Sequence, residues 1–352
     1  MLLSDFDYAL PAELIARRPA DRRDASRLMV LYRDTGRVEH RRFCDILSYL
    51  KAGDCLVLND SKVLPARLFG VRERAGAEGA RVECLLVRRV NGDIWEIMAR
   101  PGKRLRRGDV LRFTESGDFA AEVLDRLADG LRLAAFRYDG DFMERLSSIG
   151  SMPIPPYMGR AADETDKTRY QTVYARAWGS VAAPTAGLHF TDELLRAASA
   201  AGVHIARLTL HVGPGTFRPV KAARVEEHAM HLEEYEIDED CAARVNAAIA
   251  EKRRVVCVGT TSARALESAA FYDRAAGGHR VAAGRAGTDI FIYPGYAFKC
   301  VDALLTNFHL PKSTLLMLVS AFYDREAVLR AYAEAVALGY GFFSYGDAML
   351  IL

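Results

Sequence analysis

Small, hydroxyl and basic residues gather in the last third of the chain, where a strand is expected to turn into a helix. The apolar run VVCV is followed by Gly259, Thr260, Thr261 and Ser262, with Arg264 two residues further on. The first amides of a helix have no acceptor inside the helix, so such a turn can bind a carboxylate or a phosphate. The alternative is an ordinary turn with a Ser or Thr cap. The chain lacks the GxxxxGK[ST] and GxGxxG motifs, which disfavours the common nucleotide-binding folds.

Two other stretches place a histidine among small residues. SVAAPTAGLHFT, residues 180 to 191, has Thr185 and Gly187 just before His189, and LHVGPGTF, residues 210 to 217, has His211 at the expected end of a strand. Glycine lets a backbone approach a ligand closely, and α/β sheets bind ligands beyond the carboxyl ends of their strands. Imidazole titrates nearest to neutral pH, so each histidine is a candidate acid or base. The alternative for each is a structural histidine in the core.

Polar residues also follow two later apolar runs. LTNFHLPKSTL contributes Asn307 and His309 just before a proline, and FFSYGDAML contributes Tyr345 and Asp347 beside a glycine. Polar residues in loops are more often functional than polar residues within elements. We therefore count these four residues among the candidates for the site.

No metal site is expected. HAMHLEEYEI places His228 and His231 close together, but the HExxH pattern is absent and no third ligand is evident. The six cysteines are scattered, with no CxxC pair, which is typical of reduced thiols in a cytoplasmic protein.

The pattern of apolar residues predicts two domains. A helix-like stretch covers residues 11 to 28, and strands are expected at LMVLYRD and DCLVLND. Short alternating stretches from residue 67 onward predict a small antiparallel β-barrel. Strands and helices then alternate from residue 204, with helices at 263–272, 313–322 and 324–339 and a strand at 288–295. We expect an α/β protein with a large, barrel-like α/β catalytic domain, residues 1–66 and 145–352, and an inserted β-barrel domain, residues 67–144.

Charge and hydropathy exclude several classes of protein. With 48 basic and 46 acidic residues the net charge is +2, so an RNA site must be a local patch; ARRPADRR and KRLRRGD are the candidates. Asp5 and Asp7 stand where an export signal has basic residues. The apolar run TLLMLVSAFY is too short to span a membrane. We expect a cytoplasmic protein without a membrane segment, and a monomer because no apolar interface stripe is evident.

Several long stretches together resemble one family of enzymes. LNDSKVLPARLFG, GSVAAPTAGLHFT, LHVGPGTFRPV, HAMHLEEYEI, VGTTSARALES, TNFHLPKSTLLMLVSAF and FFSYGDAMLI are similar to the S-adenosylmethionine:tRNA ribosyltransferase-isomerases of the queuosine pathway. The likeness runs almost end to end and is weakest at about residues 71 to 140. One departure is Gly341, where the family has an arginine.

The resemblance implies a transferase and isomerase that modifies tRNA. Members transfer the ribosyl part of S-adenosylmethionine to 7-aminomethyl-7-deazaguanine at the wobble position of tRNA, which leaves epoxyqueuosine and releases adenine and methionine. S-adenosylmethionine is then a co-substrate, and no tightly bound cofactor is expected. The sulfonium would acidify a ribose carbon, so the site needs a base as well as donors for the methionine carboxylate.

Roles for individual residues follow as expectations from the resemblance. Acids or bases are sought among His189, His211, Asp60 and Asp289, with Glu233 and Asp347 as competitors. The cofactor's carboxylate is assigned to Gly259, Thr260, Thr261, Ser262 and Arg264. Substrate binding is assigned to Thr185, Gly187, Asn307, His309, Tyr345 and Asp347, and stacking to Phe190, Tyr293, Phe308 and Tyr345. Two alternatives are an S-adenosylmethionine-dependent RNA methyltransferase and a non-catalytic RNA-binding protein.

Overall fold

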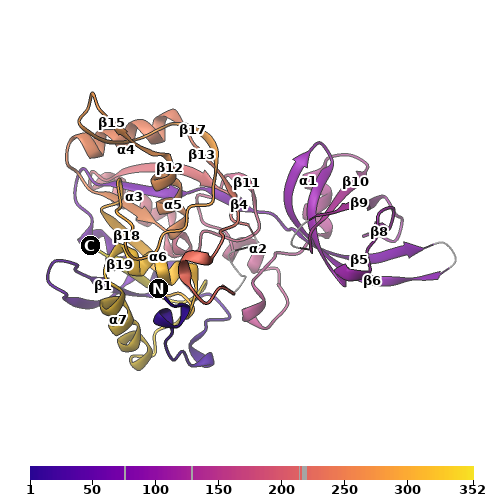
Figure 1. The fold of residues 1–352 in the computed structure, drawn as a ribbon, viewed down its shortest axis with the longest axis horizontal. Coiled ribbons are helices and arrows are strands. Elements are labelled where there is room, and N and C mark those ends of the chain that lie inside the picture. Colours follow the sequence, from indigo (N-terminus) through magenta and orange to yellow (C-terminus); the bar gives the residue numbers. More distant parts are fainter. Residues whose placement is uncertain (75–76, 128–129, 214, 216–219) are drawn as a thin grey trace.

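A large α/β body carries a smaller β-barrel on one side (Figure 1). The computed structural model describes residues 1–74, 77–127, 130–213, 215 and 220–352. The predicted combination of an α/β class with an inserted antiparallel barrel is confirmed.

A nine-stranded mixed sheet forms the centre of the large domain. Its order is β17-β13-β12-β3-β14-β18-β19-β1-β2. In that order the strands are β17 (Gly284–Thr288), β13 (Glu233–Ile237), β12 (His204–Leu210), β3 (Cys55–Asn59), β14 (Val255–Val258), β18 (Ala303–Asn307), β19 (Ala348–Ile351), β1 (Arg27–Leu31) and β2 (Val38–Arg42). The four strands β12, β3, β14 and β18 are mutually parallel. Among the described strands, β17 and β2 are the edges of this sheet, and each pairs antiparallel with its neighbour.

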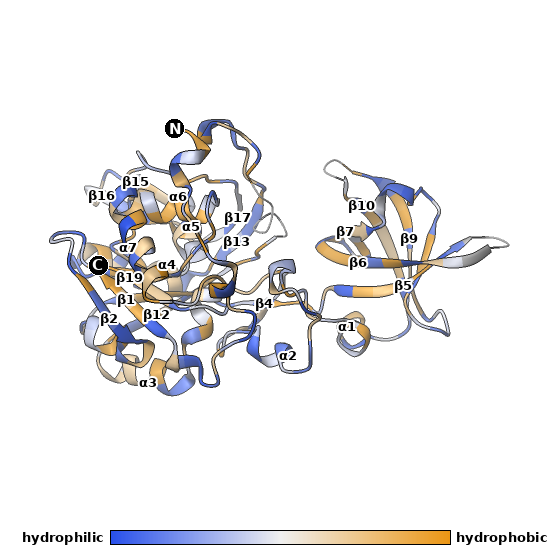
Figure 2. Cartoon of the chain, turned by 90° about the horizontal axis from the view of Figure 1, so that it is seen from below, coloured by the Kyte–Doolittle hydropathy of each residue, from blue (hydrophilic) through white to orange (hydrophobic). Residues whose placement is uncertain are grey.

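Helices cover both faces of this sheet because alternate strand residues point to opposite sides. Val57 and Cys257 pack with α4 (Glu239–Ala250), α5 (Thr260–Ala269), α6 (Thr314–Phe322) and α7 (Arg325–Ala337). Their neighbours Leu56 and Val258 pack with α3 (Asp192–Ala200) on the other face. Figure 2 shows the contrast between the hydrophobic β1 and the hydrophilic edge strand β2. Charged side chains on an edge strand oppose pairing with another chain.

The inserted domain is a closed six-stranded antiparallel barrel of order β10-β7-β6-β5-β8-β9. Its strands are β5 (Arg67–Arg74), β6 (Ala77–Asn91), β7 (Ile94–Arg100), β8 (Val110–Arg112), β9 (Phe119–Arg126) and β10 (Arg132–Tyr138). Helix α1 (Phe142–Ile149) places Phe142 and Leu146 in the barrel core, so the packed unit extends beyond residue 144. The two connections to the large domain pair with each other where Arg67 and Ser151 exchange backbone hydrogen bonds.

Two expected elements are wrong. Residues 11 to 26 form only the short 3-10 turns η2 (Ala12–Leu14) and η3 (Arg23–Ala25), because Pro11 and Pro19 interrupt the helical pattern, and the last two residues of the expected helix belong to β1. The strand expected at 288–295 is irregular, since β17 ends at its first residue and Pro294 follows. The helix expected at 263–272 ends at Ala269, where β15 (Ala270–Asp273) begins.

Among the described residues, none of the helices has the length and apolar character that a membrane crossing requires.

Candidate functional site

Seven of the fifteen predicted site residues meet in one small cavity, which we call the loop cavity. It has a volume of about 60 Å³ and lies at the carboxyl ends of β14 and β18. These strands are parallel neighbours, so the loops that follow them emerge side by side. The predicted residues that line the loop cavity are Thr185, Gly259, Thr260, Thr261, Arg264, Asn307 and His309.

The start of α5 presents donors to the loop cavity. Helix α5 has no side-chain cap, whereas α3, α4, α6 and α7 each begin at a capping Thr, Asp or Ser. Gly259 turns the chain with φ +87°, and the amide of Ala263 is the first that bonds back, to the carbonyl of Gly259. The earlier amides therefore remain for a ligand, and the helix dipole favours an anion there.

Arg264 adds a buried positive charge to the same cavity. Its side chain is 6% exposed and forms an ion pair with Glu233, while its Nε donates to the carbonyl of Ile290 at 3.3 Å. Within the described part of the chain, Arg264 Nη2 and the Thr261 hydroxyl are buried without a hydrogen-bond partner. Buried polar atoms are nearly always bonded, so these two groups indicate a polar ligand that completes the site.

His189 does not line the loop cavity but holds residues that do. Asn307 Nδ2 donates to His189 Nε2 at 3.0 Å, and the Thr185 hydroxyl donates to Asn307 Oδ1 at 2.8 Å. Because Asn307 donates to Nε2, the proton belongs on the other ring nitrogen, Nδ1, which is 2.7 Å from Ser26 Oγ and donates to it. Burial, with a smaller effect of Arg23, lowers the pKa of His189 to about 4. The imidazole is therefore neutral, and the geometry favours a positioning role over an acid–base role.

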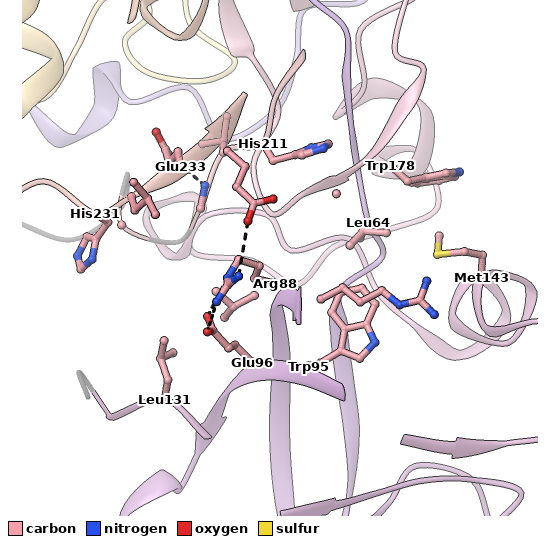
Figure 3. A pocket seen from close by; sticks show the side chains of 18 residues that line it. Leu64, Arg88, Trp95, Glu96, Leu131, Met143, Trp178, His211, His231 and Glu233 are labelled. Carbon is pink, nitrogen blue, oxygen red and sulfur yellow. Dashed lines mark hydrogen bonds and ion pairs between the residues drawn. The ribbon is translucent and has the colours of Figure 1, made fainter. Parts of the chain in front are cut away.

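A second and larger cavity lies between the two domains, and we call it the interdomain cavity. Its volume is about 410 Å³ (Figure 3). The large domain contributes Leu64, Trp178, Gly179, His211, Val212, Gly213, Gly215, His231, Leu232, Glu233 and Glu234. The barrel domain contributes Val87, Arg88, Arg89, Trp95, Glu96, Leu131 and Met143. Sequence reasoning missed this cavity because its two halves are far apart in the chain.

The two cavities share a wall. Val212 lines both of them. Glu233 lines the interdomain cavity and pairs with Arg264, which lines the loop cavity. The other oxygen of Glu233 accepts from the amide of Gly213 at 2.9 Å, so both of its oxygens are engaged. A ligand that reached from one cavity to the other would pass this residue.

His211 is the predicted acid or base that faces the interdomain cavity. Its ring packs directly against Gly179, because a Cβ atom on residue 179 would lie only 2.6 Å from His211 Cε1. In the described structure its Nδ1 is buried without a partner. Burial lowers its pKa, and the nearby carboxylates of Glu234 and Asp60 oppose that shift. Asp60 itself is fully buried and accepts from the Thr209 hydroxyl at 2.6 Å.

Four predicted residues support the loops without lining either cavity. Ser262 donates to the carbonyl of Val258. Gly187 leaves room for Tyr174, because a Cβ atom on residue 187 would lie only 2.0 Å from the Tyr174 hydroxyl. Tyr345 donates to Asp166 at 3.0 Å. Asp347 accepts from the amide of Gly341 at 2.7 Å and pairs with Arg27.

The stacking roles expected of two aromatic residues are wrong. Phe190 and Phe308 are fully buried and pack edge-on against Phe43 and Tyr332, respectively, so neither has a face open to a base. Tyr293 packs against Phe291, with ring centroids 5.0 Å apart. Asp289 is exposed just after β17 and is not among the residues lining either cavity.

No metal site emerges from the described residues, where no three His, Cys, Asp or Glu side chains are arranged to hold an ion. The histidine-rich run is used differently: His228 lies edge-on against Phe291, and His231 lines the interdomain cavity.

Comparisons with known proteins agree along the whole chain. Residues 3–351 match the family described as "Queuosine biosynthesis protein". Proteins named S-adenosylmethionine:tRNA ribosyltransferase-isomerase from Halothermothrix orenii and Symbiobacterium thermophilum are 52% and 53% identical over 352 residues, with each chain fully covered. A crystal structure described as an S-adenosylmethionine tRNA ribosyltransferase from Thermotoga maritima is 40% identical, with a TM-score of 0.54 over 99% of this chain and all of that one. The chain therefore belongs to the queuosine biosynthesis protein family.

Proposed function

We propose that the loop cavity binds the methionine carboxylate of S-adenosylmethionine during ribosyl transfer to tRNA. The chain is an S-adenosylmethionine:tRNA ribosyltransferase-isomerase. It transfers and isomerises the ribosyl moiety onto 7-aminomethyl-7-deazaguanine at the tRNA wobble position, which yields epoxyqueuosine and releases adenine and methionine. One observation carries the site assignment: the start of α5, which has no side-chain cap, and Arg264, whose Nη2 has no partner among the described residues, line the same cavity.

The size of the loop cavity limits what it can hold. A volume of about 60 Å³ is below the several hundred Å³ typical of a site for a whole small molecule. Only the amino-acid end of the cofactor fits there. The sulfonium and the ribose must extend past Val212 and Glu233 toward the interdomain cavity, since these residues stand between the two cavities.

The chemistry assigns different tasks to the two histidines. The positive sulfonium acidifies the adjacent ribose carbon, so a base can remove its proton before adenine leaves and the amine attacks. His211 faces the interdomain cavity with a pKa lowered by burial, which keeps it neutral and able to accept a proton at physiological pH. His189 orients Asn307 and, through it, the Thr185 hydroxyl in the loop cavity. Positioned donors of this kind contribute to catalysis without exchanging protons.

The protein acts without a tightly bound cofactor in this proposal. S-adenosylmethionine is consumed as a co-substrate, and tRNA is the macromolecular partner. We place the enzyme in the cytoplasm, where tRNA is modified, and expect a monomer, because both cavities are built from one chain.

A decisive experiment mixes the purified protein with S-adenosylmethionine and tRNA carrying 7-aminomethyl-7-deazaguanine. We expect adenine and methionine in equal amounts, with a matching gain in nucleoside mass after digestion of the tRNA. S-adenosylhomocysteine as the product would indicate a methyltransferase. Binding of tRNA with neither product would indicate a non-catalytic RNA-binding protein.

A further inference from the structure

We propose that the interdomain cavity is the binding site for the modified wobble base, with Trp178 as its stacking face and Glu234 as the partner of its amine. This inference rests on the proposed function, because that reaction supplies the substrate: a flat purine-like base with a positively charged arm. It goes further by assigning residues from both domains to the recognition of that base.

Trp178 has the position and exposure of a stacking residue. It lies in β11 (Ala177–Ser180), which pairs in parallel with β4 (Ser61–Val63), and it is 42% exposed although large aromatic residues are usually well buried. It lines the interdomain cavity directly before Gly179, whose missing side chain makes room for His211. An indole face open to a cavity of about 410 Å³ can take a base by stacking.

Lys62 strengthens this assignment. Its ammonium lies 4.1 Å from the centroid of the Trp178 ring, and the two residues are paired across the strands. Lys62 holds the indole in place through a cation–π contact and adds positive charge beside the cavity, where the phosphates flanking a base would lie.

The cavity changes in chemical character from one side to the other. Figure 3 shows Trp178, Leu64 and Met143 gathered on one side, and Arg88 bridging two carboxylates on the other. Arg88 pairs with Glu96 of the barrel and, at 3.5 Å, with Glu234 of the large domain. An apolar wall opposite a carboxylate pair matches a base that carries a cationic aminomethyl arm.

Arg88 occupies the place that the substrate's amine would take. A primary alkyl amine has a pKa near 10, so the free arm is a cation at neutral pH, as the guanidinium is. The Arg88–Glu234 contact is long, and the two side chains are 47% and 59% exposed, so this ion pair is weak. The amine can displace Arg88 from Glu234, and Arg88 keeps Glu96 as its partner.

The first test compares Trp178→Ala and Trp178→Phe with the wild type. Stacking of one base on an aromatic side chain predicts a rise in KM for tRNA of about 5- to 150-fold in the alanine variant, with a smaller rise in the phenylalanine variant. KM for S-adenosylmethionine should not change. Phe271→Ala is a matched control, since Phe271 is 46% exposed in β15, outside both cavities.

The outcomes separate this inference from the proposed function. No adenine release by the wild type would refute the proposed function itself. An active wild type with an unchanged KM for tRNA in Trp178→Ala would overturn the inference alone. A parallel rise of both Michaelis constants in both Trp178 variants would also overturn it, because it would indicate general damage to the fold.

The second test concerns the amine. Wild-type protein should bind tRNA with 7-aminomethyl-7-deazaguanine more tightly than the same tRNA with guanine at that position. Glu234→Gln should lower this preference several-fold and leave the affinity for the guanine-containing tRNA unchanged. A preference that survives in Glu234→Gln would remove Glu234 from the recognition of the amine.

Discussion

Arg264→Lys is the sharpest perturbation of the proposed carboxylate site. Replacement by alanine would leave the buried Glu233 without its positively charged partner, which typically costs about 3–5 kcal/mol of folding free energy. Lysine keeps a positive charge beside Glu233 but lacks the second guanidinium arm, the Nη2 group that has no partner in the described structure. The fold should therefore survive while one contact to the ligand is lost.

The expected size follows from the kind of contact. A hydrogen bond between charged groups contributes about 1.5–3 kcal/mol, which corresponds to a loss of affinity for S-adenosylmethionine of about 10- to 150-fold. The effect belongs in KM rather than kcat, because the carboxylate is remote from the reacting ribose carbon and is bound in the ground state and the transition state alike. Arg254→Lys is the control: Arg254, although more exposed than Arg264, also pairs with a buried carboxylate, that of Asp54, at the opposite end of β14.

A cycle between protein and ligand tests the contact directly. Dissociation constants are measured by equilibrium dialysis for wild type and Arg264→Lys, each with S-adenosylmethionine and with its decarboxylated analogue. If Arg264 binds the carboxylate, the mutation weakens S-adenosylmethionine but leaves the analogue unaffected. Equal weakening of both ligands would refute the assignment of the carboxylate to Arg264.

Three further predictions concern the residues around the site. Burial lowers the pKa values of His189 and His309 to about 4 and about 3, so as the pH falls below 6.5 these histidines are protonated in the unfolded chain but not in the folded one. Each histidine should therefore lower the free energy of unfolding by about 2 kcal/mol between pH 7 and pH 5. Urea unfolding that shows no such loss would contradict the burial of both side chains in the neutral form. Thr185→Val removes one neutral hydrogen bond and should lower kcat/KM for S-adenosylmethionine about 2- to 12-fold with little change in Tm; an unchanged kcat/KM would exclude the Thr185 hydroxyl from binding. Gly179→Ala places a carbon 2.6 Å from His211 Cε1 and should lower kcat at least about 10-fold, and normal turnover in the folded variant would show that the position of His211 does not matter.

The loop cavity was within reach of sequence reasoning because its residues follow strands. Gly259 and Asn307 each come directly after or at the end of an apolar run, and the carboxyl ends of β14 and β18 bring them to the same edge. The run of small residues before His189 was within reach for a related reason: Thr185 lies in the short turn η8 (Thr185–His189), which packs against β18. Local signals succeed here because adjacent parallel strands place successive loops together.

The roles of individual polar and aromatic residues were not within reach, because burial decides them. Tyr345 and Asp347 have the side chains of a binding site, yet Tyr345 bonds to Asp166, and Asp347 bonds to backbone amides and pairs with Arg27. Phe308 follows Asn307 in the chain but points into the core among other aromatic rings. A single residue step reverses the direction of a side chain at the end of a strand, and sequence alone does not tell which of two neighbours faces the ligand.

The one residue of the interdomain cavity that sequence reasoning could have singled out is Trp178, because the chain has only two tryptophans. Its other walls come from Arg88 and Glu96, which lie in the weakest part of the family resemblance and are brought near Glu234 only by the packing of the two domains. A closed barrel can present such residues on a fixed surface without being part of the large sheet. The inserted domain therefore has a physical task in the proposed reaction: it supplies the second half of a cavity whose first half ends at His211.

The wall between the cavities links cofactor binding to base binding. Glu233 is held by Arg264 on one side and by the Gly213 amide on the other, so its carboxylate is fixed between the two. A cofactor carboxylate at Arg264 Nη2 would share the guanidinium with Glu233 and weaken the hold on that residue. The Gly213 amide lies next to Val212, which lines both cavities, so the change would be passed to the wall beside His211. Glu233 and Val212 therefore lie where the two proposed ligands would meet.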